Sequence, residues 1–315
     1  MDGNTIKGVV TESKSGRQAI LAKRIIDATG DADIAHFAGV PYRIDPKETL
    51  EEVSVNFGCS GVDIDKFLNY TLNKPSSVAD WGDESGEKET EEFSTFLIEP
   101  FNKAKEAGEM PGHVRIESYW GNFTEAGEIT SLNAIFMPNY DPTNVWDLTR
   151  AEIEGRKQVM WAVAALRKYT PGFENARLRT IGASLGVRES RKIEGHYNLT
   201  QRDVLNQARF EDSIGICPEF LDGNDIAIMP STGRYFHVPY GIILPQRVEN
   251  LLVAGRSVAG DKISHAATRQ MMCCTVTGQG AGVAAAVSIK ENITCERISI
   301  QKMQSALKKQ GVRID

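Results

Sequence analysis

The sequence predicts an α/β fold in which one domain, built from both ends of the chain, is interrupted by a domain of mixed α+β character. Strand-forming residues lie near both termini, at residues 20–27 and 251–254, and a helix rich in glycine and alanine follows the second stretch. The intervening region, about 200 residues with longer loops and more aromatic side chains, is typical of one domain inserted into another. We therefore expect a first segment at residues 1–43, an insertion at residues 44–245, and a return at residues 246–315.

The composition is ordinary for a globular protein and narrows the classes of function. Of 315 residues, 41% are hydrophobic and 25% charged, and the formal net charge is −6. A nucleic-acid binder needs an excess of Lys and Arg to displace counterions, so the charge argues against that class. Because no apolar leader and no run of about 18 apolar residues is found, we expect a cytoplasmic protein without a membrane partner. The acidic residues 80–90 are expected to form an exposed loop.

The N-terminal region predicts a β-hairpin followed by a short helix. Residues 5–11 and 18–26 are rich in β-branched and apolar side chains, and a polar, Gly-containing turn separates them. The second strand leads into a short helix that either Asp31 or Asp33 is expected to cap. Gly39 is expected to end this helix, because glycine readily adopts the left-handed conformation of a helix C-terminus.

The middle region predicts three helices. One is expected over residues 91–107, and the clearest spans residues 150–169, opened by a capping box of Thr149 and Glu152. Its apolar positions recur at helical spacing and are expected to face the core. A second capping box predicts a helix over residues 200–210.

The C-terminal region carries the most informative pattern. A buried strand at residues 251–254 is followed by a Gly-containing turn, a polar loop, and a Gly-rich segment from Gly278 to Gly282 that we interpret as the entrance of a small-residue helix. Glycines let a ligand approach the backbone, and free N–H groups at a helix entrance favour an anionic or electron-rich ligand. An amphipathic helix is expected over residues 299–311.

The cysteines indicate neither a disulfide framework nor a metal site. They are odd in number, no C-x-x-C occurs, and no histidine lies at ligand spacing from them. The adjacent pair Cys273 and Cys274 leaves two alternatives open, namely redox chemistry or packing as small apolar side chains. The five positions are Cys59, Cys217, Cys273, Cys274 and Cys295.

Four segments in this order resemble a known family. They are IIDATGDADIAHFAGVPY at residues 25–42, GVRESRKIEG at residues 186–195, YFHVPYGIILP at residues 235–245, and residues 250–286. Together they resemble the FAD-dependent oxidoreductases of the glutathione-reductase-like flavoprotein superfamily, which are related to the flavoprotein component of heterodisulfide reductase. The resemblance implies a Rossmann-type FAD-binding domain, interrupted by a substrate domain, and two-electron transfer between flavin and a small organic substrate.

The resemblance also implies which residues approach the cofactor. In such proteins FAD lies beside several segments. These are the strand end with the sequence Ala-Thr-Gly, the turn after the late strand, and the Gly-rich helix together with the polar segment before it. Carried over to this chain, the implied cofactor residues are Ala28, Thr29, Gly30, Gly255, Arg256, Thr268, Arg269, Gly278, Gln279, Gly280, Ala281 and Gly282.

Four further residues are candidates for catalysis. His265, in a loop expected near the flavin edge, is the candidate for proton transfer. Arg188 and Arg191 would share one face of a helix, where they would either contact an anion or the flavin, or pair with nearby carboxylates. Tyr240 either faces substrate or packs at the domain junction.

One expected motif is not found in this sequence. A flavoprotein of this kind begins with a strand and G-x-G-x-x-G, which seats the pyrophosphate, and Gly278–Gly282 does not match it because Val283 takes the place of the third glycine. We therefore expect a C-terminal portion of an FAD-dependent oxidoreductase that lacks a half of about 100–150 residues. The alternatives are a truncated non-catalytic remnant, or one subunit of a split flavoprotein that does not bind FAD alone. The expected partners are a small-molecule substrate, a chain that supplies the dinucleotide-binding half, and a second copy of this chain.

Overall fold

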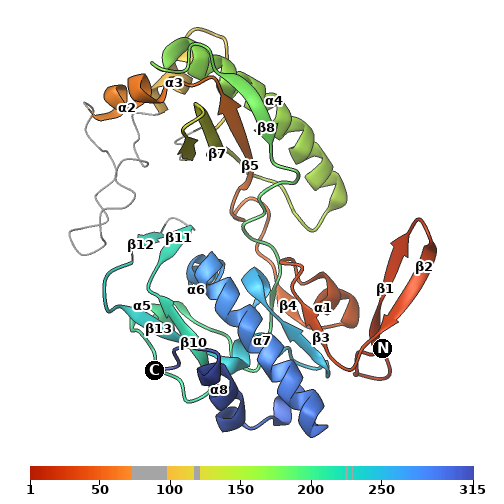
Figure 1. Cartoon of the computed structure of the whole chain (residues 1–315). Coiled ribbons are helices and arrows are strands. Elements are labelled where there is room, and N and C mark those ends of the chain that lie inside the picture. The colour runs from red at the N-terminus through yellow and green to blue at the C-terminus, as the bar shows by residue number, and fades with distance from the viewer. Residues whose placement is uncertain (73–97, 117–120, 224–225, 229) are drawn as a thin grey trace. The chain divides into compact units, whose positions relative to one another are not determined.

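The structure, a computed structural model, divides the chain into two compact units (Figure 1). Unit 1 comprises Met1–Asp45 and Glu189–Asp315, and unit 2 comprises Pro46–Arg188. Residues 189–245, which the sequence analysis grouped with the insertion, lie in unit 1 together with the two chain ends. The predicted α/β character is confirmed, in the form of helices and small sheets. The structure describes residues 1–72, 98–116, 121–223, 226–228 and 230–315.

Unit 2 is built on an antiparallel sheet with helix α4 packed against it. The strand order is β6-β7-β5-β8, and buried side chains such as Phe57, Leu132 and Leu166 fill the space between sheet and helix. Burial of this apolar surface is the main source of the unit's stability. Its elements are β5 (Val53–Ser60), α2 (Ile64–Leu72), α3 (Glu99–Glu106), β6 (Asn122–Thr124), β7 (Glu128–Met137), α4 (Val145–Tyr169) and β8 (Arg177–Ile181).

The starts of two predicted helices in unit 2 have different outcomes. One helix begins earlier than predicted, and the predicted start of the other lies outside the described residues. Helix α4 begins at Val145, because the side chain of Asn144 accepts hydrogen bonds from the backbone N–H groups of Trp146 and Asp147 at 2.9 and 3.3 Å. The prediction of Thr149 as the cap was wrong, since its hydroxyl donates to the Val145 carbonyl inside the helix. Residues 80–97, with the predicted acidic loop and the start of the predicted helix, lie outside the described part, and α3 forms the remainder.

The described residues of unit 1 form five small two-stranded sheets. The predicted hairpin is confirmed, with strands that pair antiparallel and end at Leu21. The pair that positions the site is β3 with β14, which run parallel and place Ile25 beside Leu251 and Asp27 beside Val253. The pairs are β1 (Gly8–Ser13) with β2 (Gly16–Leu21), β3 (Ile25–Asp27) with β14 (Leu251–Val253), β4 (Tyr42–Arg43) with β9 (Lys192–Ile193), β10 (Ser213–Pro218) with β13 (Tyr235–Pro239), and β11 (Leu221–Gly223) with β12 (Ile226–Ile228).

The helices of unit 1 confirm some of the expected caps. Thr200 forms the predicted capping box with Asp203, although the helix that it opens ends at Leu205. The first helix ends at Gly39 as expected, but neither Asp31 nor Asp33 caps it, since the N-cap is Ala32 in the left-handed conformation. The helices are α1 (Asp33–Ala38), α5 (Gln201–Leu205), α6 (Lys262–Thr268), α7 (Met271–Glu291) and α8 (Ile300–Lys309), with 3-10 turns η2 (Tyr240–Ile243), η3 (Gly255–Ser257) and η4 (Cys295–Arg297).

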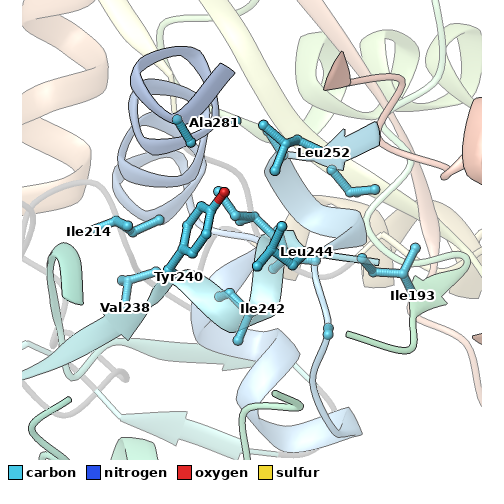
Figure 2. Packing of buried hydrophobic residues seen from close by; sticks show 14 of the residues in the cluster. Ile193, Ile214, Val238, Tyr240, Ile242, Leu244, Leu252 and Ala281 are labelled. Carbon is cyan, nitrogen blue, oxygen red and sulfur yellow. The ribbon is translucent and has the colours of Figure 1, made fainter. Parts of the chain in front are cut away.

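Helix α7 is the central helix of unit 1. It packs against β10, α8 and the β3–β14 pair, and Figure 2 shows its Ala281 above the ring of Tyr240, with Ile214 and Leu244 alongside. By length and composition α7 is apolar enough to cross a membrane. The core helix of a globular domain can have the same length and composition. One face of α7, with buried residues from Cys273 to Ser288, packs inside unit 1, as expected for a core helix.

The two glycines Gly155 and Gly282 give a test of the packing. Both lie in helix interiors, where Ala is favoured over Gly by about 1 kcal/mol. A Cβ at Gly155 would collide with the buried and stiff side chain of Val55, whereas a Cβ at Gly282 would meet nothing within 4 Å. We expect Gly155→Ala to lower the free energy of unfolding by about 1–2 kcal/mol through overpacking. The matched variant Gly282→Ala should raise it, and denaturant unfolding measures both. Equal effects would contradict the packing of α4.

Candidate functional site

The carboxyl ends of β3 and β14 bring together two segments that the sequence singled out. Parallel strands end at the same edge, so Ala28, Thr29 and Gly30 follow β3 beside the turn that follows β14. The guanidinium of Arg256, in that turn, lies against the backbone of Gly30, whose φ is +82°. A Cβ at this position would overlap the guanidinium where it now lies, and the positive φ by itself favours glycine here.

Asp27 holds the turn after β3 in shape. Its buried carboxylate accepts hydrogen bonds from the Thr29 N–H and hydroxyl at 3.0 and 2.7 Å, and from the Ala35 N–H of α1 at 2.9 Å. The hydroxyl of Thr29 is therefore engaged within the turn. The sequence analysis did not single out Asp27, and the signal for it was a carboxylate at the end of an otherwise apolar strand.

Asp31 is the point at which three segments of unit 1 meet. Its carboxylate accepts hydrogen bonds from the Ser190 hydroxyl at 2.7 Å and from Arg256 at 2.9 Å. Its carbonyl accepts from the Arg191 guanidinium at 3.0 Å, and the same guanidinium pairs with Asp33 at 2.8 Å. Arg191 is nearly buried, so this pairing is what makes its charge tolerable there.

Arg188 and Arg191 do not share a helix face, so that expectation was wrong. Residues 188–191 are not helical, and the two arginines fall in different units. Arg188 of unit 2 lies 3.9 Å from Glu51, with its guanidinium 4.7 Å from the centre of the Phe136 ring. The Gly and Ser residues around this segment and the lack of a helix cap explain the difference.

His265 lies in helix α6 rather than in a loop. The carboxylate of Asp261 caps α6 by accepting from the Ser264 N–H at 2.7 Å, a cap that the sequence analysis did not recognise. The imidazole is 1% exposed, and neither ring nitrogen has a hydrogen-bond partner. Burial, together with the charges of Lys192, Arg269 and Arg256, holds the pKa of His265 well below 6.5, so the ring is neutral at pH 7.

Unpartnered buried polar atoms gather in one segment, residues 256–269. Buried polar groups almost always find a partner, so such a cluster needs an explanation. Arg269 uses its terminal nitrogen on Asp222, including the carboxylate at 3.1 Å, but its Nε remains without a partner. Thr268, beside it, is also buried. The unpartnered atoms of this segment are Arg256 Nε, Ser257 Oγ, His265 Nδ1 and Nε2, and Arg269 Nε.

The Gly-rich segment lies inside helix α7, so its prediction as a helix entrance was wrong. The helix begins at Met271, seven residues before Gly278. Glycine has a weak preference for helices, but tertiary packing outweighs that preference here. A Cβ at Gly280 would collide with Ile214, so the close packing of α7 needs a residue without a side chain at this position. Gly278 and Gly282 are exposed, and a Cβ at either would meet nothing within 4 Å. They therefore leave backbone accessible on one side of α7.

The other residues predicted on α7 have separate roles. Ala281 is fully buried, and the side-chain amide of Gln279 donates to Gln310 at 3.0 Å. Thr277, one residue before the glycines, accepts a hydrogen bond from the Gly255 N–H at 3.0 Å and so ties the end of β14 to α7. A Cβ at Gly255 would also meet open space, although its φ of +84° favours glycine.

Tyr240 belongs to the core of unit 1. Its ring is 3% exposed and its hydroxyl donates to the Cys295 carbonyl at 3.0 Å, as part of the packing that Figure 2 shows. Burial raises the pKa of this phenol, so the hydroxyl stays protonated. Of the two alternatives for Tyr240, packing agrees with this environment.

Cys273 is bonded to Cys217 of β10 and not to its neighbour Cys274. The expectation that the cysteines form no disulfide was therefore wrong. The partners are 56 residues apart in the sequence, a separation that no local spacing reveals. Cys274 is a free thiol.

Comparison with known proteins adds one match. A family model described as FAD dependent oxidoreductase matches residues 1–307, and so covers the whole of unit 2 and nearly all of unit 1. No curated protein and no solved structure matches the chain.

The buried neutral imidazole gives a pH dependence that can be measured. Below pH 6.5 the unfolded chain takes up a proton at His265 that the folded chain does not, so the free energy of unfolding falls as the pH falls. The contribution reaches about 1.4 kcal/mol per pH unit. We expect His265→Gln to flatten the dependence between pH 6.5 and pH 5, measured by denaturant unfolding at each pH. His196→Gln, at a half-exposed histidine, is the control, and the same slope in both variants would contradict the neutral burial of His265.

Proposed function

Because the chain belongs to the FAD dependent oxidoreductase family, we propose that unit 1 holds FAD at the carboxyl ends of β3 and β14. The reaction is the transfer of an electron pair between the flavin and a small organic substrate. When bound, FAD supplies the two-electron acceptor, and the protein supplies binding, orientation and electrostatics.

The observation that carries this proposal is the cluster of unpartnered polar atoms in residues 256–269. Arg256, His265 and Arg269 keep nitrogen atoms that are buried and without hydrogen bonds. A bound polar ligand that satisfied them would remove an energetic cost of about 1–3 kcal/mol for each atom. The residues present therefore fit a polar, electron-rich group. The positive charges of the two guanidinium groups favour a bound group that gains negative charge during the reaction.

The glycines give such a group access to the backbone. Gly255, Gly278 and Gly282 all have open space where a Cβ would stand. At Gly30, by contrast, that space is filled by the guanidinium of Arg256, so Gly30 serves the cofactor by seating Arg256. Thr29 keeps this turn in place through its hydrogen bonds to the carboxylate of Asp27, and Ala28 lies between these two residues.

The proton that accompanies the electron pair is assigned to His265. The neutral imidazole has one acceptor nitrogen that can receive this proton. Negative charge on a bound group would offset the neighbouring cations that otherwise keep the ring unprotonated. Arg191 is engaged with Asp31 and Asp33 and acts as a positioning residue for this turn. Arg188, which lies beside Glu51 within unit 2, remains a candidate for contact with an anion.

A second candidate function follows from the incomplete sheet. Among the described residues, β3 and β14 have no strand partner except each other, although parallel sheets are usually larger and covered on both faces. Leu21 and Ile26 near this pair are 81% and 38% exposed. A partner polypeptide that adds a Rossmann-type, dinucleotide-binding half to β3 would cover them, which is the arrangement of a split flavoprotein related to the glutathione-reductase-like enzymes. In either case we propose a cytoplasmic location.

The visible spectrum of the purified chain with added FAD tests both candidates. If this chain forms the flavin site, we expect stoichiometric flavin and a flavin spectrum shifted from that of free FAD. Gly278→Leu, which fills the open space on α7, should weaken FAD binding by about tenfold or more, or about 1.4 kcal/mol. The matched variant Gly112→Leu, at an equally open glycine of unit 2, should bind FAD as the parent chain does. A folded chain that binds no FAD would contradict the first candidate and favour the split flavoprotein.

A further inference from the structure

The disulfide between Cys217 and Cys273 joins two elements at the centre of unit 1. Cys217 lies near the end of β10 and Cys273 in the first turn of α7, with Cα atoms 5.7 Å apart, inside the normal range for a disulfide. Both side chains are buried, at 0% and 2% exposure. The bond therefore ties the β10–β13 sheet to the start of the central helix.

The packing of α7 on β10 includes close contacts other than this bond. A Cβ at Gly280 of α7 would collide with Ile214 of β10, and a Cβ at Gly215 of β10 would collide with Val276 of α7. The two backbones thus approach closely through glycines on both sides. Because apolar contacts of this kind persist without the bond, the unit can remain folded with both cysteines reduced.

The position of Cys273 favours exchange of the bond. It is the third residue of α7, so its sulfur lies in the first turn, at the positive end of the helix dipole. Met271 and Met272 before it are 81% and 41% exposed, so the first turn of the helix lies at the surface. In a cytoplasmic protein, a disulfide is more often a redox device than a structural staple.

The neighbouring thiol of Cys274 links the same turn to α6. Its sulfur lies 3.6 Å from the Thr268 carbonyl and 3.4 Å from the Arg269 carbonyl, at the end of the helix that carries His265. Burial raises the pKa of this thiol, so it stays protonated and donates to these carbonyls. A change at Cys273 is therefore transmitted directly to the α6–α7 junction.

We propose that Cys217 and Cys273 form a reversible dithiol–disulfide site, opened by a small dithiol reductant, and that its state sets how firmly the α6–α7 junction is held. A thiolate of the reductant attacks one sulfur, the S–S bond breaks, and a mixed disulfide forms. The second thiol of the reductant resolves it, so the two cysteines gain two electrons and two protons while the reductant becomes a disulfide. This site goes beyond the proposed flavin chemistry and does not require FAD.

Thiol counting tests the proposal on the whole chain. The folded protein is equilibrated with oxidised or reduced dithiothreitol, then unfolded, alkylated and weighed by mass spectrometry. We expect three alkylated cysteines after oxidation, namely Cys59, Cys274 and Cys295, and all five after reduction, with full return on reoxidation. Cys274→Ser should keep the redox-dependent difference of two, whereas Cys217→Ser should remove it.

Hydrogen exchange of residues 262–275 tests the coupling to the junction. Exchange there should be faster in the reduced protein and in Cys217→Ser, and in that variant it should not respond to dithiothreitol. If dithiothreitol reduces the disulfide only after the protein unfolds, the proposal is wrong and the bond has a purely structural role. Five alkylated cysteines under both conditions would overturn it because no disulfide forms, and equal exchange in both states would overturn the coupling. None of these readouts involves flavin, so they are independent of the FAD result.

Discussion

The parallel pairing of β3 with β14 is the constraint on which the rest of unit 1 depends. It joins residues 25–27 to residues 251–253, and it places the two turns that follow these strands at one edge. The contact of Arg256 with Asp31 and the close approach of its guanidinium to Gly30 exist only because that edge is shared. Such a long-range pairing has a high entropic cost of chain closure, so burial of the flanking apolar residues has to offset it.

The buried charged and polar side chains of unit 1 are of two kinds. Some have oppositely charged partners, and others keep nitrogen atoms without a hydrogen bond. Lys192 is buried and has two carboxylate partners, Glu189 at 2.5 Å and Asp45 at 3.0 Å. Arg191 is likewise paired, as expected for charges whose removal from water must be compensated. The nitrogens of His265 and the Nε atoms of Arg256 and Arg269 are buried without such compensation. That exception is the observation on which the proposed cofactor site rests.

Local patterns in the sequence predicted local structure well. The hairpin, the strand at residues 251–253 and the Thr200 capping box were predicted correctly because short-range sterics and hydrogen bonds decide them. The start of α7 was misplaced because glycine in a helix is recognised only once its packing partner, here Ile214, is known. The disulfide and the contacts of Arg191 join residues more than 50 positions apart, so no periodicity reveals them. The assignment of cofactor residues stays a prediction, and the fold shows which of their side chains are already engaged with other residues of the protein.

The contact between Gly30 and Arg256 also bears on how this protein can vary. Any side chain at position 30 meets the guanidinium, and the positive φ there penalises most residues even without it. Losing the guanidinium of Arg256 would leave the Asp31 carboxylate with the hydrogen bond from the Ser190 hydroxyl. Loss of Arg256 therefore removes the steric reason for glycine at position 30 but not the conformational one. Among natural relatives, arginine at position 256 should be found together with glycine at position 30, whereas that glycine should persist also where the arginine is lost.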